Sequence, residues 1–172
     1  MTRLATLLLA LLAATAAGCD GGNDSNVATQ PPPTTTQSEA SEAALRQAVR
    51  TALNDNRRLS VYVLWNNRIP AWADRSTRGP ALASLRGAAQ NRRSRGVRVR
   101  LLEGRREIRS IRLDPSYAEA TAVVVDRQRV QPSRRNGRPI GRAVVLNERA
   151  RYELRRVGRT DRFVVWRVVL LE

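Results

Sequence analysis

The sequence contains no histidine, no lysine and only one cysteine among 172 residues. Without histidine, Ser-His-Asp and Cys-His nucleophile pairs, histidine-ligated zinc and the usual general base near neutral pH are excluded. The lone Cys19 excludes a disulfide within the chain. Any catalysis must therefore rely on Asp, Glu, Tyr or Arg, and we expect neither a metal site nor a cofactor.

The missing lysine makes the positive charge unusual. All 31 basic residues are Arg, and with 15 acidic residues they give a formal net charge of +16. Codon usage in a G+C-rich genome favours Arg over Lys, but Arg also forms forked hydrogen bonds to phosphate and carboxylate. The length suits one domain with short extensions.

Residues 1–18 have the pattern of a signal peptide. Arg3 precedes the apolar run LATLLLALLAATAA at residues 4–17, and this run is shorter than the roughly 20 apolar residues of a membrane-spanning helix. Ala16, Ala17 and Gly18 directly before Cys19 resemble the lipobox of bacterial lipoproteins, although Ala16 stands where Leu is commonest. An ordinary secretory signal, in which Cys19 has no special role, is the alternative.

The lipoprotein resemblance implies that diacylglycerol is attached to Cys19 and that the chain is cleaved before it. Because one acyl chain holds a protein only weakly, two or three chains are expected to give stable attachment. We therefore expect a lipid-anchored protein on the outer face of the cytoplasmic membrane. Residues 19–39 are rich in Gly, Asn, Pro and Thr without an apolar pattern, which predicts a disordered tether.

Residues 40–172 are predicted to form one α+β domain. Apolar spacing predicts a first helix through Leu45, Val49 and Leu53, and a second helix that opens at Gly79-Pro80 and stops at Gly96. Residues 59–67 fit either a strand or a continuation of the first helix, ending before Pro70. Strands are predicted at residues 97–103, 106–113, 117–131, 142–157 and 161–171. Helices followed by an antiparallel meander indicate an α+β class.

This order of elements resembles the nuclear transport factor two-like superfamily. The segments RGPALASLRGAAQNRRSRGVRVR and ELRRVGRTDRFVVWRV, after a leading lipobox, look like uncharacterised secreted or lipid-anchored bacterial members. The resemblance implies a cone-shaped fold, in which a curved antiparallel sheet is packed against the N-terminal helices. It carries no catalytic motif.

Strand alternation places Glu148 among core residues, on the same face as Val144, Leu146, Ala150 and Tyr152. Because a cone-shaped fold can enclose a cavity, a carboxylate there could recognise a polar group of a ligand. The candidate pocket residues are Tyr62, Trp65, Tyr117, Glu148 and Tyr152. Alternatively, Glu148 pairs with an Arg or faces water at a bulge. The three tryptophans, Trp65, Trp72 and Trp166, are predicted to lie in the core.

A dense Arg segment offers a second candidate surface. Its residues are Arg92, Arg93, Arg95, Arg98, Arg100, Arg134 and Arg135. Such charge attracts polyanions, which outside the cytoplasm are wall phosphate polymers, acidic glycans or lipid headgroups. Nucleic acid is not expected, because the chain is predicted to be exported and shows no nucleic-acid-binding motif. A solvated Arg face set by codon usage is the alternative.

These observations predict a non-enzymatic binding or scaffolding domain of the cell envelope, whose ligand or protein partner the sequence does not identify. The exposed face of the sheet could also form the interface of a homodimer. Polyanion binding is the second hypothesis. The third is a histidine-free hydrolase or isomerase, because limonene epoxide hydrolase-like members of the superfamily activate water with Asp and Arg, roles to which Asp126 and Glu148 could be assigned.

Overall fold

The computed structural model describes residues 35–172, with side chains from residue 41 onward. The predicted signal peptide and Cys19 lie outside the described residues, as does most of the predicted tether. Residues 34–172 form one compact unit. Its first helix begins at Thr35, earlier than the predicted domain boundary at residue 40.

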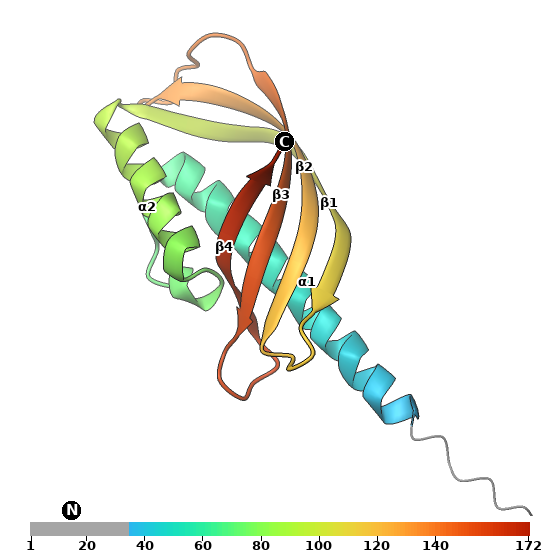
Figure 1. Ribbon diagram of the computed structural model, residues 1–172. Coiled ribbons are helices and arrows are strands. Elements are labelled where there is room, and N and C mark those ends of the chain that lie inside the picture. Colours follow the sequence, from blue (N-terminus) through green and yellow to red (C-terminus); the bar gives the residue numbers. More distant parts are fainter. Residues whose placement is uncertain (1–34) are drawn as a thin grey trace, which may run out of the picture. The chain divides into compact units, whose positions relative to one another are not determined.

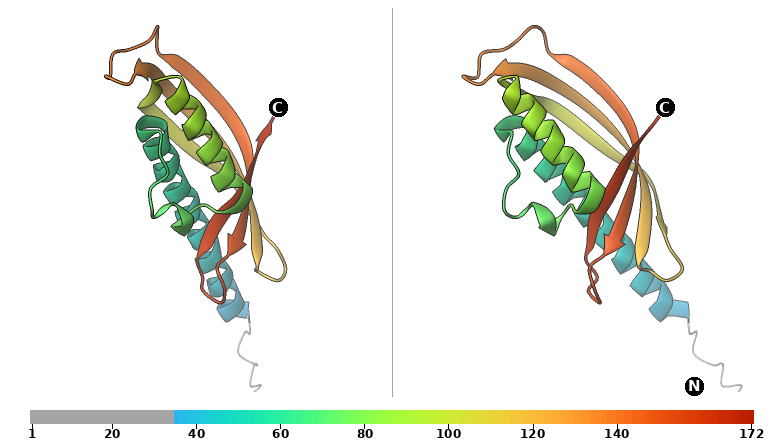
Figure 2. Two further views of the ribbon diagram at one scale, coloured as in Figure 1. Left: turned by 90° about the vertical axis from the view of Figure 1, so that its left-hand side faces the viewer. Right: turned by 60° about the vertical axis from the view of Figure 1, so that its left-hand side comes forward.

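The unit consists of two helices packed on one face of an open, four-stranded antiparallel sheet with the order β1-β2-β3-β4 (Figure 1). The elements are α1 (Thr35–Asn66), the 3-10 helix η1 (Ala73–Arg75), α2 (Gly79–Ser94), β1 (Val97–Leu113), β2 (Glu119–Arg134), β3 (Val144–Arg156) and β4 (Phe163–Leu171). Figure 2 shows the sheet curving around the two helices. The predicted α+β class is confirmed.

The ambiguous segment at residues 59–67 continues α1. Leu59 and Val63 are fully buried at helical spacing and pack with Ala73, Leu82 and Ala89. The helix stops at Asn67, which has a φ of 52° and donates its backbone N–H to the Val63 carbonyl. A left-handed residue of this kind satisfies the last carbonyls of a helix, so the helix ends before it reaches Pro70.

The two strands predicted at residues 97–103 and 106–113 are one strand, β1, so the prediction of five strands was wrong. Gly104 pairs with Gln128 instead of forming a turn, and a bulge lies between Leu101 and Glu103. A Cβ on Gly104 would lie 2.6 Å from Nη2 of Arg57. The glycine therefore admits a close side chain from α1 without breaking the strand.

The main core lies between α1 and strands β2, β3 and β4. Leu45, Val49 and Leu53 of α1 pack against alternate residues of the strands, among them Val124 and Leu154. Of the three tryptophans predicted to be core, Trp65 and Trp166 are half-buried. Trp72 is 38% exposed, which makes its prediction wrong; it lies on the short segment after α1 and meets Tyr62 edge-on.

Candidate binding groove

A buried ion pair joins β1 and β2 on the face of the sheet that packs against the helices, called here the inner face. Arg106 and Asp126 are direct partners in the strand register. Nε of Arg106 donates to Oδ1 of Asp126 at 2.9 Å, and Nη2 donates to Oδ2 at 2.6 Å. The two side chains are only 6% and 7% exposed. This forked geometry is the strongest form of an Arg–carboxylate contact.

The remaining donors of Arg106 tie the pair to a helix and to a third strand. Nη1 donates to the Leu53 carbonyl of α1 at 2.7 Å, and Nη2 donates to the Tyr152 hydroxyl of β3 at 3.0 Å. No buried side-chain N or O atom of the described residues lacks a partner. Arg106, Asp126 and Tyr152, called here the inner cluster, thus form a closed hydrogen-bond network.

Burial and the neighbouring charges fix the protonation states of two members of the inner cluster. Burial lowers the pKa of Arg106. The hydrogen bond to Asp126 and the nearby Tyr152 and Asp126 together raise this pKa by more than burial lowers it, so the net shift is upward. Burial raises the pKa of Tyr152, and this outweighs the lowering effect of the Arg106 charge. At neutral pH the cluster therefore holds a guanidinium and a neutral phenol.

A groove lies between the helices and the inner cluster. One hollow of about 320 Å³ sits over Arg106, Asp126 and Tyr152, and a second of about 540 Å³ lies between α2 and β4. The hollows adjoin, because both are lined by Ser60, Leu85 and Tyr152. We call them together the inner groove. Its apolar walls are Val61, Leu64, Leu85, Leu146, Val168 and Leu170.

The inner groove is bordered by a free strand edge. Strand β4 ends at Leu171, which pairs with Arg149, so residues 144–148 of β3 pair with β2 alone within the described part of the chain. Three consecutive apolar residues of this edge are exposed: Val144 by 47%, Val145 by 64% and Leu146 by 36%. Such edges are normally covered or charged, because their backbone groups can pair with another chain.

The structure brings together only some of the predicted pocket residues. Glu148 and Tyr152 line the same hollow of the inner groove. Tyr62 and Trp65 line a separate hollow, formed with Arg100 and Leu101 of β1. Tyr117 lies in the β1–β2 turn, with a φ of 56°, and packs against the main core. Glu148 is exposed, not enclosed by the core, because it belongs to the part of β3 that extends beyond β4.

Sequence reasoning missed the central residue of the site. Arg106 is one of many Arg residues in β1, and nothing local distinguishes it. The sequence feature that points to this site is Asp126, which follows the small apolar residues Ala122 and Val124 on the inner face of β2. A carboxylate at such a position requires a buried cation.

The predicted Arg surface divides into inward and outward residues. Arg92 turns inward: its Nε donates to Oδ1 of Asn67 at 3.1 Å and its Nη2 to the Val63 carbonyl at 3.3 Å, and burial lowers its pKa. Arg93, Arg98 and Arg135 line a polar hollow of about 310 Å³. The remaining members are Arg95 after the end of α2, Arg100 on β1 and Arg134 at the end of β2.

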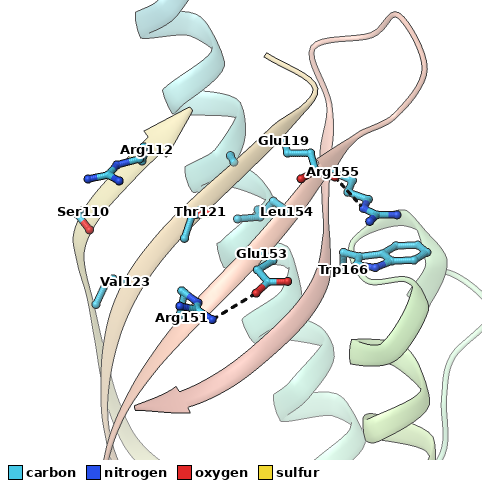
Figure 3. Close-up of a pocket in the computed structure, with 11 residues that line it drawn as sticks. Ser110, Arg112, Glu119, Thr121, Val123, Arg151, Glu153, Leu154, Arg155 and Trp166 are labelled. Atoms are coloured by element: carbon cyan, nitrogen blue, oxygen red, sulfur yellow. Dashed lines mark ion pairs between the residues drawn. The ribbon is translucent and has the colours of Figure 1, made fainter. Parts of the chain in front are cut away.

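A further hollow lies on the outer face of the sheet (Figure 3). Its acidic groups are paired: Arg151 lies 3.7 Å from Glu153, and Arg155 lies 3.2 Å from Glu119. The guanidinium of Arg155 also stacks on the Trp166 ring, with Cζ 4.2 Å from the ring centroid. These contacts occupy the two acidic side chains that line the hollow.

No family model matches this chain, and no curated protein matches it. Among solved structures, it resembles the intermembrane space region of the chloroplast protein ARC6, with a TM-score of 0.59 and 11% sequence identity. The match covers 73% of this chain and 95% of that chain. At this identity the likeness concerns the fold alone. Among the helices of the described residues, none has the length and apolar character needed to cross a bilayer.

Proposed function

We propose that this domain is a non-enzymatic binding module, and that its inner groove binds an extended segment of a partner protein. The observation that carries the proposal is the free edge of β3 at residues 144–148, which borders an apolar groove. An extended peptide can add to such an edge as a further strand, with main-chain hydrogen bonds giving affinity and side-chain pockets giving specificity.

The side chains of the groove suit this mode of binding. A strand added beside residues 144–148 would follow the line of β4, whose inner residues Val168 and Leu170 already face the groove. Every second side chain of the added strand would then point between α2 and the sheet. The apolar residues Leu85 and Leu146 would receive those side chains.

Charge favours an acidic partner. Beyond the Arg106–Asp126 pair, Arg57, Arg92 and Arg167 line the inner groove, and Glu148 is the only acid that lines it with them. The described residues 41–172 share this imbalance, with 30 Arg and 12 acidic residues. Complementary charge accelerates association and fixes the register of a bound segment. The apolar side chains of the partner segment would face the groove, and its alternate, acidic side chains would lie on the outer face of the sheet, near Arg127, Arg129 and Arg149.

The state of Asp126 supports binding over hydrolysis. Both of its carboxylate oxygens accept hydrogen bonds from Arg106, and Tyr152 closes the network from the third strand. A general base must lie within hydrogen-bond reach of the proton that it removes, and the side chain of Asp126 is only 7% exposed. The inner cluster acts in this proposal as a rigid floor beneath the groove.

The location of the module is part of the proposal. The lipobox pattern around Cys19 supports attachment to the outer face of the cytoplasmic membrane through acyl chains. A sheet that curves around its helices supports kinship with the nuclear transport factor two-like cone (Figure 2). Export would also separate the Arg-rich domain from cytoplasmic nucleic acid.

A labelled peptide tests the proposal. The probe is a peptide of about eight residues in which Val alternates with Glu, long enough to extend past both ends of residues 144–148. The controls are the same peptide with Lys in place of Glu, and the Val–Glu peptide with every backbone nitrogen methylated to remove its donors. Measured by fluorescence anisotropy, only the unmodified Val–Glu peptide should bind.

Matched variants locate the binding. Leu146→Ala removes part of the groove wall. It should weaken peptide binding by about tenfold, the loss expected when one side chain that contacts the partner is truncated. Val123→Ala truncates a residue of the outer face and should leave binding unchanged. Equal binding of the methylated peptide, or equal loss in the two variants, would contradict strand addition in the groove.

A further inference from the structure

We infer that Arg93, Arg98 and Arg135 form a binding site for a phosphate group. They come from the last turn of α2, the start of β1 and the β2–β3 loop, and together they line one polar hollow of about 310 Å³. None of the three lies within 4.0 Å of a carboxylate of the described residues, so no ion pair there neutralises their charge. This site is independent of the inner groove.

The backbone beneath the hollow is held in place by a buried amide. Asn67 is 8% exposed; its Nδ2 donates to the Val97 carbonyl at 2.6 Å, and its Oδ1 accepts from Arg92 at 3.1 Å. These bonds join the end of α1 to α2 and β1. Gly96, with a φ of 66°, turns the chain sharply from α2 into β1. Arg93 and Arg98 are thus brought to one hollow by fixed backbone.

Helix dipoles explain only part of this arrangement. Arg93 lies in the last turn of α2, where a cation is stabilised by the carbonyl end of the helix. Arg98 and Arg135 belong to a strand and a loop, so the dipole of their own element does not account for them. Three guanidinium groups around one hollow repel each other, and a bound anion would relieve that repulsion.

The chemistry of the lining identifies a phosphate ester as the ligand class. Guanidinium groups bind phosphate oxygens through forked, charge-assisted hydrogen bonds. The hollow adjoins the one lined by Tyr62 and Trp65, because Asn66 lines both. Arg98 bridges the two, with Cζ 5.7 Å from the centre of the Trp65 ring. The organic part of a phosphate ester would therefore lie on an aromatic surface.

Of the seven Arg residues of the predicted polyanion surface, three line this hollow: Arg93, Arg98 and Arg135. Arg92 is excluded because it is bonded to Asn67 and to the Val63 carbonyl. The phosphate could belong to a soluble phosphate ester or to the headgroup of an anionic lipid. Only the lipid also carries acyl chains.

The experiment titrates the folded protein with glycerol phosphate and with a short-chain phosphatidylglycerol below its micelle-forming concentration, followed by NMR. Arg98→Gln and Arg135→Gln should each weaken binding of both probes by about tenfold, since each removes one charge-assisted contact. Arg127→Gln is the control, because Arg127 is exposed, lies outside the hollow and carries the same charge. The Arg127→Gln variant should bind both probes with the affinity of the wild type.

Equal weakening in Arg127→Gln would overturn the site, because it would show general attraction to a basic protein. Failure of the wild type to bind either probe would also overturn it. Tighter binding of the lipid, lost in Trp65→Ala, assigns the site to lipid headgroups; equal affinity for the two probes assigns it to soluble phosphate esters. Arg135 lies on a loop, so its substitution tests the site without disturbing the core.

Discussion

The ring of Trp166 lies in the space into which a side chain on Gly79 would project. A Cβ built on Gly79 would be 2.8 Å from two carbons of that ring, and Gly79 has a φ of 55°. The first residue of α2 is therefore fitted to β4 both by its backbone conformation and by the absence of a side chain. Arg155 covers the ring with its guanidinium, 4.2 Å from the ring centroid.

Gly79→Ala should destabilise the protein. The substitution forces a left-handed Ala and a contact shorter than any normal carbon–carbon separation, for a loss of about 2–3 kcal/mol. Gly87→Ala is the matched control: it lies in α2, has nothing within 4 Å of its Cβ position and should gain about 0.5–1 kcal/mol. Urea unfolding of both variants checks the opposite signs, and a shared sign would contradict the placement of Trp166.

Removing Arg106 alone should cost more than removing the whole pair. Arg106→Met leaves Asp126 buried without a counter-charge, which typically costs about 3–5 kcal/mol. The double variant Arg106→Met, Asp126→Leu removes both charges and should be more stable than the single variant. A double-mutant cycle from chemical unfolding measures the coupling. A cycle without coupling would show that the two side chains do not share a buried site.

Alkaline pH should reveal the burial of Tyr152. Its pKa is raised in the folded state, so the stability that this shift contributes is present below the unfolded value near pH 10 and is lost as pH rises toward the folded value. The free energy of unfolding should therefore fall as pH rises above about 10 in the wild type, and fall less in Tyr152→Phe. Identical slopes in the two proteins would argue against a buried phenol.

Cys19→Ala should release the protein from the membrane fraction. The prediction follows from the apolar run at residues 4–17 and the small residues before Cys19, because acyl chains on that cysteine would be the anchor. Fractionation of expressing cells, with mass spectrometry of the mature amino terminus, measures the effect. Full retention of the variant in membranes would contradict lipid attachment at Cys19.

Periodicity predicted most of the fold, and its errors have local causes. The helical spacing of Leu45, Val49 and Leu53 and the change of period after Gly96 gave the order of helices and strands. Gly104 predicts a strand boundary, because sequence alone does not show that Arg57 occupies the space above it. The buried contacts of Leu59 and Val63 decide that residues 59–66 continue α1, which ends before Asn67.

The site was less predictable, because its residues meet only through the strand register and the helix packing. Alternation placed Glu148 and Tyr152 correctly on one face of β3. It could not show that, among the described residues, β4 pairs with β3 only as far as Arg149, which leaves Glu148 exposed and residues 144–148 paired with β2 alone. Likewise, no local pattern selects Arg106 as the partner of Asp126 or turns Arg92 inward.

Amide hydrogen exchange of the protein with the Val–Glu peptide tests strand addition most directly. If the peptide adds as a strand, it slows exchange at residues 144–148 of β3, the free edge that borders the inner groove. The peptide with methylated backbone nitrogens should produce no such protection. Unchanged exchange at residues 144–148 under saturating peptide, or protection confined to the outer face of the sheet, would contradict the account.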